Sequence, residues 1–180
     1  MTKDQDTPRR SLSFYLVLSF MEGGAVMAAE LLGARMIAPF YGTTLFVWSS
    51  VIGVTLAALA AGYFIGGYLA DRYTRNMLLF SGLALGSVLL ALMPIIAKSV
   101  LEATSGMGIR TGSLVSALAF LLPPLVCLGM TSPIIIRLAS RDLQHTGRTA
   151  GTVYAVSTIS GIVVTFLLGF YVIPVWGITI

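Results

Sequence analysis

The sequence predicts an all-α protein, a polytopic transmembrane bundle of about five helices. Of its 180 residues, 57% are hydrophobic and only 10% are charged, and the mean hydropathy of +0.93 is far above that of an average soluble domain. The apolar residues form long runs separated by short polar segments, and one crossing of the hydrocarbon core needs roughly 20 residues. Five crossings and their loops account for almost all of these residues.

The predicted spans belong to a single transmembrane domain, residues 1–180, which opens with a cytoplasmic tail, residues 1–10. The helices are expected over about residues 11–38, 45–70, 76–96, 113–138 and 149–174. The first run is interpreted as a retained helix rather than a signal peptide, because Glu22 interrupts it and no small-x-small cleavage site follows. A turn around Pro39 and Gly42 is expected to end this helix.

The later spans have their own markers. Trp48 lies near one interface of the second span, as amphipathic rings prefer. The third span leads into a polar stretch, Lys98–Gly112, which is interpreted as the longest loop. Pro123, Pro124 and Pro133 must break or kink the fourth span, since proline removes a backbone donor and clashes one turn back. The second half of that span is therefore a candidate for a separate short helix.

The basic residues predict the orientation of the bundle. Formal net charge is +4, but these residues fall between the spans and form no continuous phosphate-binding face, so nucleic acid is not an expected partner. One side collects Lys3, Arg9, Arg10, Arg72, Arg75, Arg137, Arg141 and Arg148, and the other only Lys98 and Arg110, with Arg35 near the interface. Because Lys and Arg are enriched in the cytoplasmic loops of membrane proteins, the side with more basic residues is expected to be cytoplasmic. We expect a multi-pass protein of the inner (plasma) membrane.

Glu22 is the most informative residue in the sequence. About eleven residues of helix place it roughly 16 Å into the first span, near the bilayer midplane. A charge there costs about 3 to more than 10 kcal/mol, so the carboxyl group must face protein or water, be protonated, or pair with a cation. Two interpretations stay open: a cation or proton site, and a structural carboxylic acid hydrogen-bonded to a neighbouring helix.

Glu30 and Arg35 lie further along the same helix, nearer the other interface. A long charged side chain near the interface can extend its charged end into water, so its free-energy cost is lower there. Five residues apart, the two side chains do not face each other, so an ion pair would need another helix or subunit. Glu30 is kept as a second candidate for substrate or proton binding, beside the alternative of an ordinary interfacial carboxylate.

Small residues recur at four-residue spacing in two spans. They are Ala58, Gly62 and Gly66 in the second span, and Gly82 and Gly86 in the third. Such stripes let helix backbones approach closely. Helix packing is the expected role, and movement of one helix against another is the alternative.

The segment Gly67–Arg75 resembles the signature loop of major facilitator superfamily transporters, in which glycine, aspartate and basic residues recur between the same two helices. The resemblance implies a cytoplasmic charge network that latches one conformation. The candidate members are Arg35, Asp71, Arg72, Arg75 and Arg148. The sequence departs from the pattern at Thr74, where glycine is usual, and at Asn76, where a basic residue is usual. The alternative is a charged turn that only sets topology.

A wider resemblance covers nearly the whole chain. It rests on Glu30–Arg35, Ala38–Gly42, Trp48, Gly66–Arg72, Gly147–Gly151, Tyr154–Ala155 and Thr158, which look like the membrane region of bacterial spermidine synthase-like proteins. Those proteins carry a half-transporter-like helical domain ahead of a cytoplasmic aminopropyltransferase domain. The resemblance therefore implies a half-facilitator bundle, a polyamine as the small-molecule partner, and a chain that is a fragment or a truncated variant lacking a sixth helix and the synthase domain.

The sequence predicts no enzyme activity for this chain by itself. An aminopropyltransferase needs a glycine-rich strand-to-helix turn, and the cluster Gly106–Gly112 has the wrong spacing. His145 is the only histidine, and no cysteine or carboxylate cluster has metal-ligand spacing, so no metal and no cofactor are expected.

Three functions remain open at this stage. The first is a polyamine-handling membrane domain in which Glu22 and Glu30 attract ammonium groups. The second is a small half-transporter of unknown substrate that acts as a dimer, a homo-oligomer of two copies, because facilitator folds use two halves around a central site. The third is a membrane anchor or scaffold for a separate synthase.

Overall fold

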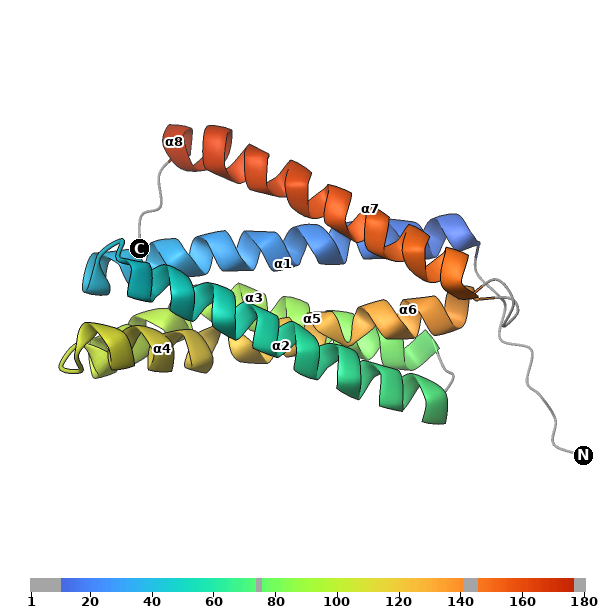
Figure 1. Ribbon diagram of the computed structural model, residues 1–180, viewed down its shortest axis with the longest axis horizontal. Helices are drawn as coiled ribbons and strands as arrows, with labels where there is room; N and C mark the ends of the chain where they lie inside the picture. The colour runs from blue at the N-terminus through green and yellow to red at the C-terminus, as the bar shows by residue number, and fades with distance from the viewer. Residues whose placement is uncertain (1–10, 74–75, 141–145, 177–180) are drawn as a thin grey trace, which may run out of the picture.

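The computed structural model describes residues 11–73, 76–140 and 146–176, and these residues are helical throughout apart from short turns. The helices lie side by side along the long axis of the molecule (Figure 1). In chain order they are α1 (Leu12–Tyr41), α2 (Leu45–Arg72), α3 (Asn76–Thr104), α4 (Ile109–Phe120), α5 (Leu122–Gly129), α6 (Thr131–Ala139) and α7 (Thr146–Phe166), which continues through the π-helical segment η2 (Leu167–Val172) into α8 (Ile173–Trp176).

The prediction of an all-α bundle is confirmed. Five helical stretches are long and apolar enough to cross a membrane: Leu12–Tyr41, Leu45–Arg72, Asn76–Thr104, Leu122–Ala139 and Thr146–Val175. Many large apolar side chains on them, such as Phe64 and Phe170, point outward and are exposed. In water these side chains would be unfavourable, whereas lipid covers them at no cost. The chain is a membrane-embedded helical bundle.

The turn predicted from Pro39, Tyr41 and Gly42 lies at Gly42, so the first helix ends about three residues later than expected. Helix α1 runs through Pro39 to Tyr41, and Gly42 ends it with a positive φ of 75°. The Gly42 N–H still donates to the carbonyl oxygen of Ala38 at 2.8 Å. A residue without a Cβ is suited to this backbone conformation, so glycine rather than proline sets the helix end.

The loop predicted over Lys98–Gly112 is wrong in most of its length. Helix α3 continues past Ile96 to Thr104, and α4 already begins at Ile109. The hydroxyl groups that suggested a loop bond to their own helix instead: Thr104 Oγ1 donates to the carbonyl oxygen of Val100 at 2.9 Å. Such bonds let serine and threonine stay in a helix away from water.

The fourth crossing is broken, as its prolines predicted, but into three pieces. Helices α4, α5 and α6 follow one another along the bundle (Figure 1), with breaks at Leu121 and Met130. Pro123 stands in the first turn of α5, where its missing N–H has no helical partner to lose. The second half of the predicted span thus forms two short helices rather than one.

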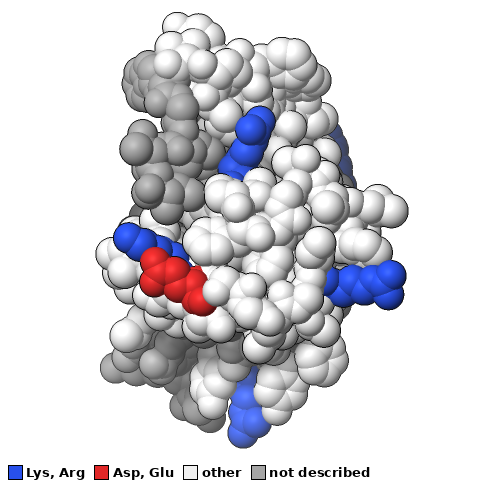
Figure 2. All heavy atoms as spheres, turned by 90° about the vertical axis from the view of Figure 1, so that its left-hand side faces the viewer, with Lys and Arg blue, Asp and Glu red and all other residues white. Residues whose placement is uncertain are grey.

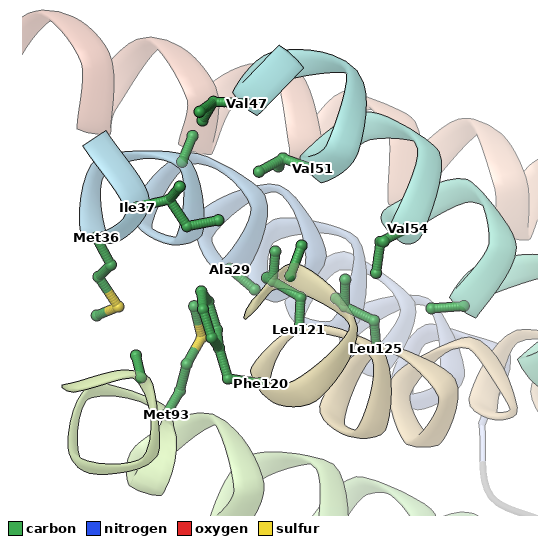
Figure 3. Close-up of a cluster of buried hydrophobic side chains, with 14 of the residues drawn as sticks. Ala29, Met36, Ile37, Val47, Val51, Val54, Met93, Phe120, Leu121 and Leu125 are labelled. Atoms are coloured by element: carbon green, nitrogen blue, oxygen red, sulfur yellow. The ribbon is translucent and has the colours of Figure 1, made fainter. Parts of the chain in front are cut away.

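Helix α5 lies in the centre of the core. Leu121, at the junction of α4 and α5, and Leu125 lie between α1 and α2, and Phe120 lies beside Met93 of α3 (Figure 3). The predicted small-residue stripe of α2 faces this same helix. A Cβ at Gly62 would lie 2.6 Å from the carbonyl oxygen of Val126, so the stripe has the packing role that its spacing predicted.

Candidate functional site

Glu22 lies inside the bundle on α1 and is only 3% exposed. Its Oε2 atom accepts a hydrogen bond of 3.3 Å from the Ser132 hydroxyl of α6 and another of 3.3 Å from the Ser157 hydroxyl of α7. Both donors are neutral. The structure therefore turns the carboxyl group toward protein, one of the arrangements expected for an acidic side chain at this depth.

Close packing of α1 against α7 positions these groups. A Cβ at Gly23 would overlap the backbone oxygen of Ser157, and one at Gly24 would lie 2.8 Å from Ser160 Oγ. The Ser19 hydroxyl adds a 2.9 Å hydrogen bond to the carbonyl oxygen of Val153. Small residues on both helices thus let the backbones approach, which places Ser157 opposite Glu22.

This α1–α7 contact was missed at the level of sequence. The signal was present, because Gly23 and Gly24 directly follow the buried glutamate, and Ser157, Ser160 and Gly161 place small residues one turn apart on the last helix. The stripes that were recognised, on α2 and α3, serve the central core instead.

Glu22 faces a cavity of about 330 Å³ between α1, α2 and α7. In Figure 1, helix α7 diverges from α1 toward its C-terminal end. Tyr63 of α2 lines the cavity beside Glu22, and its ring meets the Tyr154 ring of α7 at 6.3 Å between centroids, edge to face. This aromatic pair connects α2 and α7 at the rim of the cavity.

The carboxyl group has capacity to bind more. A carboxylate offers about four acceptor positions, and two serine hydroxyls use only part of them. Within the described parts of the chain, no basic side chain lines the cavity. An ionised Glu22 would therefore carry a negative charge without a built-in partner, which a cation or a proton from outside the bundle can neutralise.

Glu30, the second predicted acidic site, is separate from this cavity. It lies two turns further along α1, about 12 Å away along the helix axis, and is half-buried. It is not among the residues that line the cavity. The structure does not bring Glu22 and Glu30 to one ligand.

Of the predicted charge network, the structure describes Arg35, Asp71, Arg72 and Arg148, and it separates Arg35 from the other three. Arg35 is exposed near the end of α1, at the opposite end of the bundle from Arg72 (Figure 1). Arg72 donates a 3.1 Å hydrogen bond to the Tyr68 hydroxyl, and its guanidinium lies 6.0 Å from the centre of the Tyr73 ring. Asp71 and Arg148 are exposed near that second end. Arg75 and His145 lie outside the described residues.

A second buried polar region lies at the end of the bundle where α1 ends and α2 begins, called here the Tyr41 end. The Tyr41 cluster consists of Tyr41, Ser50, Thr104, Ser113 and Ser116. The Tyr41 hydroxyl donates to the carbonyl oxygen of Thr104 at 2.6 Å, the Thr104 and Ser116 hydroxyls lie 2.8 Å apart, and those of Ser50 and Ser113 lie 3.2 Å apart. These bonds tie α1, α2, α3 and α4 together.

No family model, curated protein or solved structure matches this chain. Among the described residues, no group of three or more histidine, cysteine, aspartate or glutamate side chains could hold a metal ion. What the fold and the site define is a class: a membrane-embedded helical bundle with a buried carboxyl group at the wall of a cavity between three helices.

Proposed function

We propose that this chain is the membrane domain of a spermidine synthase-like protein and that its Glu22 cavity binds the cationic group of a small molecule. The observation that carries the proposal is the position of Glu22, buried at the wall of a cavity with neutral hydrogen-bond donors only. A buried charge is costly unless it is paired. An ammonium group entering the cavity supplies the missing partner.

The kind of cation comes from the sequence resemblance. Spermidine synthase-like proteins handle polyamines, and their membrane region is the part that this chain resembles. Binding, positioning or transfer of an amine across the membrane needs no bond to be made or broken. The proposal therefore assigns no enzyme activity to this chain by itself, and the buried carboxyl group is a binding group rather than a general acid or base.

We place the bundle in the inner (plasma) membrane, with its N-terminus on the cytoplasmic side. Arg72, Arg137 and Arg148 lie at the end of the bundle where α1 begins. Lys3, Arg9, Arg10, Arg75 and Arg141 lie outside the described residues but adjoin the same helix ends in the sequence. Figure 2 views the Tyr41 end, where basic side chains are scattered over a largely uncharged surface. The excess of basic residues at the first end supports the assignment.

Labelling of Glu22 by a hydrophobic carbodiimide tests the proposal. This reagent modifies carboxyl groups that are protonated in an apolar setting, and mass spectrometry of the protein in phosphatidylcholine nanodiscs locates the modification. We expect methylammonium and spermidine to slow labelling at Glu22, because an ammonium group bound there keeps the carboxyl group ionised and covered. A neutral diol at the same concentration is the control, and Glu30, a half-buried carboxyl group of the same helix outside the cavity, is the internal reference. An unchanged labelling rate at Glu22 with both amines contradicts the proposal.

A further inference from the structure

The wall of the Glu22 cavity is polar at one end only. Glu22, Tyr63, Ser157 and Thr158 meet at that end. Helix α1 runs away from it through Val26 and Met27, and helix α7 through Ile162 and Phe166. Thr165 places one further hydroxyl among these apolar side chains. A ligand in this cavity would meet a carboxyl group at its head and hydrocarbon along most of its length.

The apolar end also leads outward. Ile162 and Phe166 line the cavity and are nevertheless 52% and 58% exposed, so the cavity opens at the bundle surface beside the last helix. Its volume of about 330 Å³ is at the lower end of the range for small-molecule sites. This shape suits one small ligand whose tail points along α7 toward the apolar surroundings.

We infer that the Glu22 cavity selects a primary amine with one positive charge and one apolar chain over an amine with several charges. The inference rests on the proposed function for its amine at Glu22, and it favours a monoamine where the sequence resemblance implies a polyamine. One carboxyl group can pair with one ammonium group. In the described part of the lining, no second acidic side chain is available, so each further ammonium group of a polyamine would have to be buried unpaired or held outside, and either arrangement weakens binding.

The same lining disfavours the amine of a phospholipid headgroup. Such an amine carries a phosphate group a few atoms away, and that phosphate would need a cation or several N–H donors. The described lining offers neither a lysine nor an arginine. The ligand chemistry that fits is therefore a free alkylamine or arylalkylamine, with the ammonium group at Glu22 and Ser157 and the chain beside Ile162 and Phe166.

Calorimetric titration of the whole chain in phosphatidylcholine nanodiscs tests the inference, with protein-free nanodiscs subtracted to remove partitioning into lipid. The ligands are n-hexylamine, n-hexanol, methylammonium and spermidine at neutral pH, where alkylamines are protonated as lysine is. We expect hexylamine to bind about tenfold or more tightly than methylammonium, because buried methylenes add affinity, and about tenfold or more tightly than spermidine, because unpaired ammonium groups oppose burial. Hexanol should not bind measurably.

Three variants assign the contacts. Glu22→Gln should weaken hexylamine binding about tenfold or more, since the charge partner is lost. Ile162→Ser should weaken hexylamine about threefold or more while leaving methylammonium unchanged, since only the chain reaches that side chain. Glu102→Gln removes an exposed carboxylate and should change neither.

The outcomes separate this inference from the proposed function. Spermidine binding as tightly as hexylamine, with loss in Glu22→Gln, overturns the single-charge inference and leaves the proposed function standing. Failure of all three amines to bind the wild-type chain overturns both. The ligand series in the wild-type protein decides the matter even where Glu22→Gln does not fold.

Discussion

The Tyr41 cluster and the Glu22 cavity are both buried and polar, but they are built in opposite ways. In the Tyr41 cluster every group is neutral, the hydrogen bonds to Thr104 are short, at 2.6 and 2.8 Å, and the Tyr41 ring is packed against Gly112. At Glu22 an ionisable group receives two hydrogen bonds of 3.3 Å and faces open volume.

Under the proposed function, this difference separates a structural polar region from a binding site inside a membrane protein. Donors and acceptors that satisfy one another, with no room for anything else, hold helices in register. Under the proposed function, an ionisable carboxyl group that has few partners and lies beside a cavity is available for a ligand. Substitutions in the first region should therefore change stability, whereas substitutions in the second should change binding.

The largest effect on stability is expected from Gly112→Val in α4. A Cβ at this position would overlap the Tyr41 ring, so the ring must move and the hydrogen bond from Tyr41 to Thr104 is lost. We expect the unfolding free energy to fall by about 3 kcal/mol, measured by SDS titration in detergent micelles. Gly53→Val in α2 is the control, because a Cβ there meets nothing within 4 Å. Equal stability of the two variants would mean that the Tyr41 end is not closely packed.

A smaller effect is expected from Thr104→Val. The substitution keeps the shape of the side chain but removes the hydroxyl that lies 2.8 Å from Ser116 Oγ, and Ser116 is fully buried. Leaving that hydroxyl unpaired should cost about 1 kcal/mol in the same unfolding assay. Thr111→Val is matched in chemistry but exposed, and it should cost much less. A loss at Thr111 as large as that at Thr104 would contradict the structural role of the cluster.

The sequence predicted the number and type of long helices because lipid imposes a simple rule on apolar length. The same rule says little about ends and breaks. Helix α3 passes through the polar stretch to Thr104 because its hydroxyls bond to their own backbone, and the fourth crossing breaks at Leu121 and Met130 rather than at the prolines themselves. The positions of these helix ends and breaks depend on the neighbouring helices against which each segment packs.

Of the residues that form the candidate site, the sequence alone identified only Glu22. Glu22 could be found because a carboxyl group in an apolar run is conspicuous. Ser132 and Ser157 are ordinary residues in helices far along the chain, and only the fold brings their hydroxyls to the same carboxyl oxygen. Glu30 is conspicuous for the same reason as Glu22, yet it lies further along α1 and does not line the cavity.

The smallest effect on stability is expected from Glu22→Met, and it bears most directly on the comparison. Methionine matches the unbranched shape of glutamate, and replacing a buried charge by an apolar side chain is often neutral or stabilising. The unfolding free energy should stay within about 1 kcal/mol of wild type, because the Ser132 and Ser157 hydroxyls can turn to carbonyl oxygens of their own helices. The variant should no longer bind hexylamine. The control is Glu102→Gln, which should leave both quantities unchanged. If Glu22→Met lowers the unfolding free energy clearly more than Thr104→Val does, Glu22 is a structural carboxylic acid. The Tyr41 cluster and the Glu22 cavity would then both serve stability.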